Sequence, residues 1–456
     1  MAANSVRKSW KLGRAELDTQ WFDVSRDGML LVKEGNYQYN IYDLVKKYGS
    51  PLEIVFPHIL EEKIEQLFAA FKTAMRRAKY RGRISYHYPM KVNQNKEFII
   101  PILSEGADLE VTSYNELWLL KKLWGQNHFN ASIKVLCNGP KIPKYIDLIT
   151  ELRNMGLSIV PIIEDLGEIE RLKGFKGDVG IRANIDIKVR SHWDKRFDQF
   201  GTSPEAILKL GRIKNLKILH YHLGSQIEDG KDIVLAAQKL TALYIKLRKT
   251  NPTLDTLDLG GGFAVPYSKT KLYPVDAIAN SLVKTISKMT RKAGVPAPNL
   301  IVEWGRYAAA PAQISIFKII HAKPVGGGSK KKWYVIDGSF MNDLLDTWAI
   351  HQKWHVVPVN RLNARRMIPV WLNGSSCDSD DKYTASGTYI RLPNIEDLEE
   401  GEQQYIAIFD TGAYQDALAS HHCLLSSPAK IVAQDGDITL ARRRETPEEI
   451  GKLFGW

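Results

Sequence analysis

Polar residues end each of eight short apolar segments between Arg83 and Arg306. The segments are RISYHYPMK, DLEVTS, SIKVLCNGP, SIVPIIE, DVGIRANI, LKILHYHLG, TLDLGGG and NLIVEWGR. At their ends stand Lys91, Glu110 with Ser113, Asn138, Glu164, Arg182, His222 with Ser225, Gly260, Gly261 and Gly262, and Glu303 with Arg306. This set contains an amine nucleophile, glycines whose backbone N–H groups can approach an anion, a serine and an arginine suited to phosphate, and a carboxylate. A phosphorylated cofactor held through a lysine requires such groups.

The eight segments must be positioned by a common framework. Each is short and rich in β-branched residues, and longer stretches of helical character separate them, among them NELWLLKKLW and KDIVLAAQKLTALYIKLRK. Alternating strands and helices imply right-handed crossovers, and eight such units predict a closed (β/α)₈ barrel of the TIM type. The carboxyl ends of barrel strands meet at one face, so we expect the polar residues to share an active site.

A different pattern follows Pro311. The segments QISIFKII, KKWYVIDGS, RMIPVWLNGS, QYIAIFD and KIVAQDGDITLARRR read as strands and tight turns, which predict an antiparallel β domain. The stretch GMLLVKEGNYQYNIYDL near the amino terminus reads as strands too. We therefore expect an N-terminal segment at 1–51 that joins the β domain, a cofactor-binding barrel at 52–312, and a C-terminal β domain at 313–456.

Composition and charge exclude several classes of protein. The 456 residues, 44% hydrophobic and 25% charged, are typical of a globular chain with two domains. The net charge of +12 is scattered and no recognition motif accompanies it, so no nucleic-acid partner is expected. The sequence has neither a secretory leader nor a membrane-spanning segment, which predicts a cytoplasmic protein without membrane partners. Three cysteines without metal-ligand spacing indicate neither a disulfide framework nor a zinc site.

Each motif taken singly has a structural interpretation. A lysine at a strand end is usually a solvated charge, a glycine triplet is usually a turn, and Glu-x-x-Arg is often a salt bridge. Ser113 and Glu116 equally fit a helix start with a capping box, and a buried inert thiol is the structural alternative for Cys377. The joint placement of the polar groups at successive strand ends favours a functional site.

The sequence also resembles a known family, the fold-type III pyridoxal-phosphate-dependent basic amino acid decarboxylases. The resemblance runs from about Tyr42 to beyond Gly412 and is greatest to the biosynthetic arginine decarboxylases. The motifs that carry it are YHYPMKVNQN, CNGPK, HYHLGSQI, LLDTWAIHQKWHVVPV, SSCDSDD and DTGAYQDAL. The resemblance implies a (β/α)₈ barrel with a C-terminal antiparallel β domain, as in the alanine racemase-like fold, and pyridoxal 5'-phosphate as the cofactor.

The family motifs also imply roles for single residues. Lys91 would be the Schiff-base lysine, His222 would stack on the cofactor ring, and Glu303 would pair with the pyridine nitrogen and keep it protonated. Matching the positions that hold the cofactor phosphate are Ser225, Gly260, Gly261, Gly262, Arg306 and Tyr414. Gly305 belongs to the same motif as Glu303 and Arg306, and Glu110, Ser113 and Glu116 match positions that line the cofactor.

Further motifs imply an obligate homodimer with shared sites. Cys377 and Asp378 would reach the cofactor of the partner subunit, where Cys377 would return a proton to the α-carbon and Asp378 would receive the cationic end of the substrate. Asp346 matches a second acidic position for the substrate side chain. Two carboxylates suit a basic amino acid, because a buried cation needs a partner. The implied reaction is decarboxylation of L-arginine to agmatine and CO₂ for polyamine biosynthesis.

Two departures from the family leave alternatives open. The usual Glu-Pro-Gly-Arg or Glu-Ser-Gly-Arg sequence is Glu303-Trp304-Gly305-Arg306, and the chain lacks the helical insertion of bacterial arginine decarboxylases. An ornithine or lysine decarboxylase is the alternative within the same chemistry; a diaminopimelate decarboxylase fits less well, since an acidic pair would repel its second carboxylate. A non-catalytic homologue would lack the lysine or phosphate ligands. Mg²⁺, used by some relatives, has no recognisable ligand cluster in the sequence.

Overall fold

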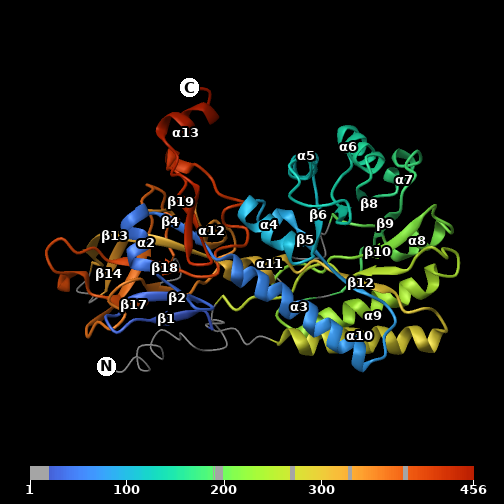
Figure 1. Ribbon diagram of the computed structural model, residues 1–456, viewed down its shortest axis with the longest axis horizontal. Helices are drawn as coiled ribbons and strands as arrows, with labels where there is room; N and C mark the ends of the chain where they lie inside the picture. The colour runs from blue at the N-terminus through green and yellow to red at the C-terminus, as the bar shows by residue number, and fades with distance from the viewer. Residues whose placement is uncertain (1–19, 188, 190–198, 268–272, 327–330, 384–388) are drawn as a thin grey trace. The chain divides into compact units, whose positions relative to one another are not determined.

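Eight parallel strands form a closed barrel in the computed structural model (Figure 1), which describes residues 20–187, 189, 199–267, 273–326, 331–383 and 389–456. In barrel order the strands are β5 (Ile84–Pro89), β6 (Asp108–Val111), β7 (Lys134–Cys137), β8 (Ser158–Ile163), β9 (Val179–Arg182), β10 (Leu216–His220), β11 (Thr256–Asp258) and β12 (Asn299–Val302). The ring closes where Leu300 of β12 pairs with Ile84 of β5. The predicted barrel is confirmed.

One helix precedes the first barrel strand, and a helix follows each of the eight strands. They are α3 (Pro57–Arg77), α4 (Lys96–Ser104), α5 (Tyr114–Gly125), α6 (Pro143–Asn154), α7 (Gly167–Arg171), α8 (Pro204–Lys209), α9 (Gly230–Leu247), α10 (Val275–Ala293) and α11 (Gly305–Ala309). Neighbouring helices α9 and α10 lie side by side (Figure 1). Their sequences explain their limits, because Asp229 caps α9 through the Lys231 amide and Gly294, at φ 65°, ends α10 in the left-handed conformation.

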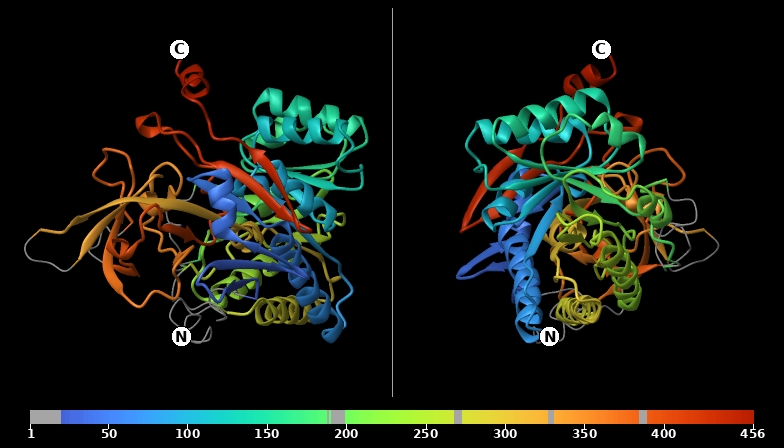
Figure 2. Two further views of the ribbon diagram at one scale, coloured as in Figure 1. Left: turned by 60° about the vertical axis from the view of Figure 1, so that its left-hand side comes forward. Right: turned by 90° about the vertical axis from the view of Figure 1, so that its right-hand side faces the viewer.

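A second sheet of nine strands contains most of the carboxyl-terminal part of the chain. Its strands are β4 (Leu52–Val55), β13 (Gln313–Pro324), β14 (Lys332–Ile336), β15 (Val356–Pro358), β16 (Met367–Asn373), β17 (Ile390–Pro393), β18 (Tyr405–Ile408), β19 (Ala429–Gln434) and β20 (Asp437–Arg442). The long strand β13 and the hairpin of β19 and β20 stand out in Figure 2. Most pairs are antiparallel, as predicted, but β4 with β19 and β14 with β16 are parallel, because long stretches of chain connect them.

The amino-terminal strands form a small sheet of their own. It comprises β1 (Phe22–Val24), β2 (Leu30–Glu34) and β3 (Tyr37–Asn40), and helix α2 (Ile41–Tyr48) follows. A backbone hydrogen bond from Leu30 N to Val359 O, 2.8 Å long, ties β2 to the segment after β15.

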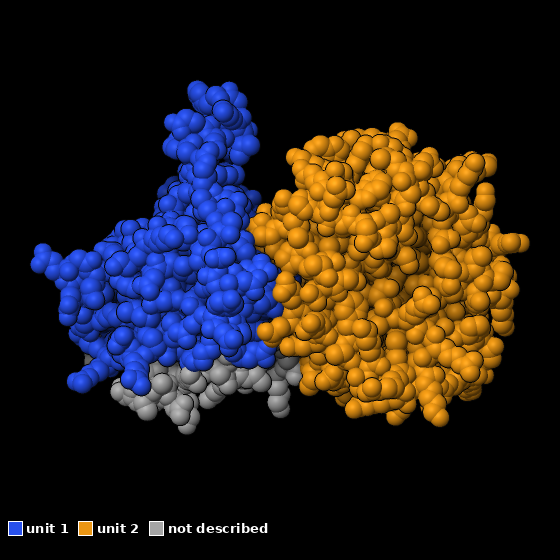
Figure 3. Space-filling view, viewed as in Figure 1, with its two compact units in different colours: residues 1–60, 266–271, 309–456 blue, residues 61–265, 272–308 orange. Residues whose placement is uncertain are grey.

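Chain contacts divide the protein into two compact units (Figure 3). The β unit comprises residues 1–60, 266–271 and 309–456, and the barrel unit comprises residues 61–265 and 272–308. The domain limits 1–51, 52–312 and 313–456 stay a prediction about how the chain folds. Within the described ranges, no helix is long and apolar enough to cross a membrane.

A buried ion cluster joins three strands of the β unit to the turn after β18. Lys430, fully buried on β19, lies 3.3 Å from Glu53 of β4 and also pairs with Asp416. Arg442 of β20 contacts the same two carboxylates, at 3.0 Å and 2.9 Å. The two cations hold the pKa of Asp416 at about 2 despite its burial. The cluster therefore fixes the 411–418 turn to the sheet.

Removal of the buried cation is expected to destabilise the β unit strongly. Lys430→Met would leave Glu53 and Asp416 buried with Arg442 alone, so we expect the free energy of unfolding to fall by about 3–5 kcal/mol. Urea unfolding followed by circular dichroism measures the loss. The matched control is Lys173→Met, which removes an exposed pair with Glu170 and should change stability by at most about 0.5 kcal/mol. Equal effects of the two substitutions would contradict the prediction.

Candidate functional site

The carboxyl ends of the barrel strands bring the predicted polar groups to one face. Lys91 lies in the 3₁₀ turn Met90–Val92 that directly follows β5, Glu110 lies near the end of β6, and Glu303 directly follows β12. Asn138 joins two of them, since its Nδ2 lies 2.9 Å from Glu110 Oε1 and 3.4 Å from Glu303 Oε1. Although β6 and β12 are distant in sequence, their carboxylates thus converge inside the barrel.

Glu303 is a buried carboxylate held in its charged form. It is 2% exposed, and its Oε2 lies 3.6 Å from His220 Nε2. Burial by itself would raise the pKa of Glu303, but the charges of His220, His222 and Lys91 and the hydrogen bond with His220 outweigh burial and place the pKa well below its usual range. The barrel therefore presents a fixed negative charge at the end of β12.

The other two buried carboxyl groups of this face behave in the opposite way. Burial, with the negative charge of Glu303, raises the pKa of Glu110 to about 8, although Lys91 acts against the shift. Burial and the Glu303 charge likewise raise the pKa of Asp258, the last residue of β11, well above its usual value. The protein therefore favours the charged form of Glu303 and the protonated forms of Glu110 and Asp258.

His220 and Asp258 are members of the site that the sequence analysis missed. Each is the last residue of its strand. The sequence motifs instead indicated His222 and the glycine triplet, which begins two residues after Asp258. The ligand atoms of His220, Asp258 and Glu303 all lie within 4.8 Å of one another, which is close enough to hold a metal ion. Mg²⁺ prefers oxygen ligands alone, however, and a protonated Asp258 is a poor ligand for it.

The glycine triplet lies against the loop that follows β10. A Cβ atom on Gly260, at φ 58°, would lie 2.2 Å from Tyr221 O, and one on Gly261 would lie 2.7 Å from His222 Nε2. The loop 221–229 that carries Ser225 is bonded to the triplet, because Ile227 N donates to Gly262 O at 3.0 Å. The absence of side chains thus lets two backbone segments and one imidazole approach each other closely.

The turn after β12 packs against the lysine segment in the same way. A Cβ on Gly305 would lie 2.7 Å from Pro89 Cγ and from Val92 Cγ2, the residues that flank the Lys91 turn. Arg306 follows as a largely buried residue of α11. The Glu-x-Gly-Arg sequence therefore places Glu303 and Arg306 on either side of a residue that packs against the Lys91 turn. Only glycine fits at this position, 305.

Trp304 points away from the strand ends and into the helix layer. Its ring centroid is 4.5 Å from that of Phe263 and 5.5 Å from that of Phe71 on α3, and the residue is 2% exposed. Its backbone carbonyl accepts a hydrogen bond from Tyr86 OH at 3.4 Å. The tryptophan is therefore a packing residue between the barrel and α3.

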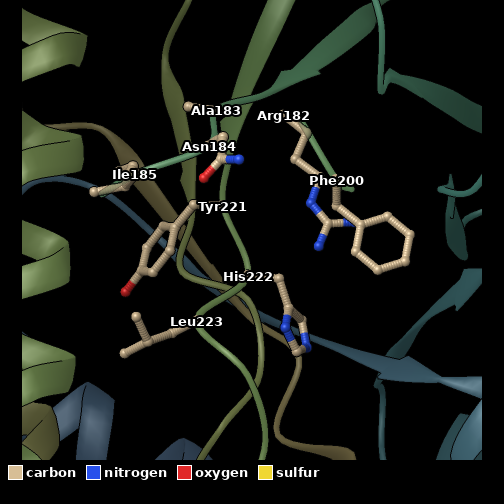
Figure 4. Close-up of a pocket in the computed structure, with 8 residues that line it drawn as sticks. All are labelled: Arg182, Ala183, Asn184, Ile185, Phe200, Tyr221, His222 and Leu223. Carbon is tan, nitrogen blue, oxygen red and sulfur yellow. The ribbon is translucent and has the colours of Figure 1, made fainter. Parts of the chain in front are cut away.

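A small pocket opens beside His222 at the ends of β9 and β10 (Figure 4). Its lining consists of Arg182, Ala183, Asn184, Ile185, Phe200, Tyr221, His222 and Leu223. Arg182 lies 4.5 Å over the ring of Phe200 and pairs with Glu164 at 3.1 Å. Gly224 N lies 3.2 Å from His222 Nδ1 and holds the ring from one side. The imidazole thus has a fixed orientation.

Ser113 and Glu116 form a helix start. Ser113 Oγ accepts from Glu116 N at 3.2 Å as the N-cap of α5, and Glu116 Oε2 accepts from Thr112 N at 2.7 Å. Glu116 Oε1 also accepts from Gln94 Nε2 at 3.2 Å, three residues after Lys91. The helix start is therefore confirmed for Ser113, whereas Glu116 accepts from the residue before the N-cap and does not complete the predicted capping box. Glu116 also contacts the segment that carries the lysine.

The β unit carries the remaining predicted residues. Asp346, buried at the start of α12 (Asp346–Ala349), is held by Gln415: Asp346 N donates to Gln415 Oε1 at 3.1 Å, and Gln415 Nε2 donates to Asp346 Oδ2 at 3.0 Å. Tyr414, the residue before Gln415, adopts a positive φ of 70°, which is uncommon for a bulky side chain. The structure therefore brings Asp346 and the Tyr414 turn together, and Gln415 is a contact that the sequence did not predict.

Cys377 and Asp378 lie opposite Cys423 and His422. Cys377 Sγ is 3.7 Å from Cys423 Sγ, and Asp378 Oδ2 is 3.3 Å from His422 Nε2. Cys377 is exposed, so the interpretation as a buried inert thiol is wrong: its loop 374–381 lies on the surface of the unit. The hydrogen bond with Cys423 raises the pKa of the Cys377 thiol, which therefore keeps its proton at neutral pH.

The raised pKa of Glu110 predicts a pH-dependent stability of the cofactor-free protein. A Glu110 proton is retained in the folded chain up to about pH 8 but leaves the unfolded chain near its ordinary pKa of 4.5. The free energy of unfolding should therefore fall as pH rises from about 4.5 to 8, by up to about 1.4 kcal/mol per pH unit from this group. In Glu110→Gln the free energy of unfolding should fall less steeply with pH, because the contribution of this carboxyl group is gone. Urea unfolding at pH 5, 6, 7 and 8 tests this, and parallel slopes would contradict it.

Comparisons with known proteins agree with this geometry. Residues 61–310 match the family described as pyridoxal-dependent decarboxylase, pyridoxal binding domain. The biosynthetic arginine decarboxylase of Prochlorococcus marinus (strain MIT 9313) is 23% identical over 89% of this chain and 83% of its own length. Among solved structures, the biosynthetic arginine decarboxylase of Campylobacter jejuni has a TM-score of 0.81 at 20% identity, covering 97% of this chain and 92% of its own. The diaminopimelate decarboxylase of M. jannaschii, solved with L-lysine, also has a TM-score of 0.81, at 22% identity, covering 94% and 96%.

Proposed function

Because this chain belongs to the family of pyridoxal-dependent decarboxylases, we propose that it removes the α-carboxylate of L-arginine to give agmatine and CO₂. The observation that carries the proposal is the charged, buried Glu303 at the centre of a barrel face that also holds Lys91. The relatives named as biosynthetic arginine decarboxylases support arginine as the substrate and polyamine biosynthesis as the pathway.

The residues of the barrel face fit pyridoxal phosphate. Glu110 Oε2 and Asn138 Oδ1 are buried polar atoms with no hydrogen-bond partner among the described residues, so a polar group is needed beside them. Glycines 260–262 form a backbone cradle that a side chain would fill, as a phosphate site requires. When bound, the cofactor supplies a protonated ring that accepts the electron pair left by loss of CO₂.

We assign the cofactor contacts residue by residue. Lys91 would provide the amine that holds the cofactor aldehyde. Glu303 would provide the negative charge that stabilises a proton on the ring nitrogen. His222, held by the Gly224 amide, would stack on the cofactor ring. For the phosphate we propose Ser225, Gly260, Gly261, Gly262, Gly305, Arg306 and Tyr414.

The β unit provides the groups for the substrate. Asp346, oriented by Gln415, and Asp378 would receive the guanidinium group, a planar cation that pairs well with carboxylates. Cys377 keeps its proton at neutral pH and would return it to the α-carbon after loss of CO₂. We propose that Cys377 and Asp378 serve the site of a partner subunit in a cytoplasmic homodimer.

Product identification tests the proposed substrate. The purified protein, supplied with pyridoxal phosphate, is incubated with arginine, ornithine, lysine and diaminopimelate in competition, and amines are identified by mass spectrometry. Agmatine as the main product is expected. Putrescine or cadaverine as the main product would support a decarboxylase but contradict arginine as its substrate. No amine from the native, unheated protein would point to a non-catalytic homologue. Heat-inactivated protein is the control for background amines.

Subunit mixing tests the homodimer with shared sites. Lys91→Ala and Cys377→Ala are each expected to be nearly inactive, because each removes one half of every site. If the sites are shared, a mixture that exchanges subunits contains heterodimers with one intact site, so activity should reappear on mixing. Sedimentation velocity checks that both variants form dimers. Dimeric variants that exchange subunits without regaining activity would contradict the proposal.

A further inference from the structure

The β unit contains a thiol pair that the decarboxylation chemistry does not use as a pair. Cys377 and Cys423 lie 46 residues apart, and their sulfur atoms are 3.7 Å from each other. Both side chains are exposed, and both residues lie outside regular strands and long helices, Cys423 in the 3₁₀ turn His422–Leu424. A disulfide has an S–S length of about 2.05 Å, so the sulfurs need to approach by roughly 1.7 Å.

Contacts next to the two cysteines hold their loops together. The residue after Cys377 and the residue before Cys423 form the Asp378–His422 pair, at 3.3 Å. On the Cys423 side, Asn342 Nδ2 donates to His422 O at 2.9 Å, and Ser420 Oγ lies 3.1 Å from Asn342 Oδ1. These contacts hold the loop of Cys377 and the loop of Cys423 beside each other.

The loop that carries Cys377 is itself anchored on both sides of the cysteine. Ser375 N donates to Gly338 O at 2.9 Å, and Ser376 N donates to Asp381 Oδ2 at 3.1 Å. After the cysteine, Asp380 N donates to Asp378 Oδ1 at 2.8 Å. Gly338 accepts a hydrogen bond from the Cys377 loop, and Asn342 donates one to the Cys423 loop. Both loops are therefore hydrogen-bonded to the same short segment, 338–342.

From this geometry we infer that Cys377 and Cys423 form a reversible intrachain disulfide by exchange with a low-molecular-weight disulfide such as oxidised glutathione. Cys423 Sγ attacks the glutathione disulfide and releases one glutathione; Cys377 Sγ then displaces the other. One S–S bond breaks and one forms, and the two protein protons end on the two released thiols. The third cysteine, Cys137, is buried on β7 and has a pKa raised to about 12 by burial, so it should not react.

Formation of the disulfide would also inactivate the proposed enzyme. This consequence rests on the function proposed above, in which the Cys377 thiol returns the proton to the α-carbon. A sulfur in a disulfide carries no proton, so the oxidised protein should lose at least about tenfold in the rate of agmatine formation. Reduction by dithiothreitol should restore it.

Peptide mapping after treatment with oxidised glutathione tests the inference. The full-length protein is denatured, its free thiols are alkylated, and it is digested without reduction. A peptide pair linking Cys377 to Cys423, with Cys137 as the remaining alkylated thiol, is expected. Three alkylated cysteines, or glutathione adducts without the linked pair, would overturn the inference. A Cys423→Ser variant, which leaves the proposed catalytic groups intact, should keep its activity both before and after the same treatment.

The two proposals can fail separately. Linked peptides together with lost and recoverable activity support both. Linked peptides with undiminished activity support the disulfide and contradict Cys377 as the proton donor. Activity lost equally in the wild type and in Cys423→Ser would overturn the disulfide as the cause of the inactivation.

Discussion

Lys91→Ala is expected to lower kcat for arginine by roughly three to four orders of magnitude, the upper range for loss of a group that acts on protons and covalent bonds at the reacting centre. Lys91 stands in the turn directly after β5, and it is one of the charges that hold Glu303 ionised. Its removal takes away both the amine and a positive charge. Steady-state assays of agmatine formation measure the loss.

A matched control tests whether the loss is specific to this position. Lys96, at the amino-terminal end of α4, is another lysine close in sequence, and Lys96→Ala should leave kcat within about twofold, as expected for a solvated surface charge. Borohydride treatment of the cofactor-loaded protein followed by peptide mapping should attach the cofactor to Lys91 in the control and to no peptide in Lys91→Ala. A Lys91→Ala protein with near-normal turnover would remove the basis for the proposed function.

Glu303→Gln is expected to lower kcat by roughly two to three orders of magnitude with little change in KM, as seen when one preorganised electrostatic contact is lost. The amide has the shape of the carboxylate but no charge, so the ring nitrogen of the cofactor would lose its counter-ion. Glu303→Asp, which keeps the charge on a shorter side chain, should recover part of the rate. Equal losses in the two variants would show that the fit of the side chain, and not its charge, sets the rate.

The same substitution has a second consequence within the barrel. The negative charge of Glu303 contributes to the raised pKa values of Glu110 and Asp258. In Glu303→Gln both carboxyl groups should therefore lose their protons at a lower pH than in the wild type. Carboxyl titration followed by NMR with the cofactor-free protein measures this shift, and unchanged pKa values would contradict the charge coupling described here.

Much of the barrel could be predicted because its signals are local. Short apolar runs alternate with amphipathic helices such as α9 and α10, and caps such as Asp229 and Gly294 mark their limits within a few residues. The sequence by itself also indicated that Lys91, Glu110, Asn138 and Glu303 stand at strand ends, and a parallel barrel requires such positions to share one face.

Only the tertiary structure decided which polar groups touch and which charge state each adopts. His220 and Asp258 lie two residues before His222 and Gly260, and their approach to Glu303 depends on the register of β10, β11 and β12. The contacts of Asp346 with Gln415 and of Cys377 with Cys423 span 69 and 46 residues. Sequence patterns report the propensities of neighbouring residues, whereas burial and Coulomb energy depend on distances in space, and those distances exist only once the chain has folded.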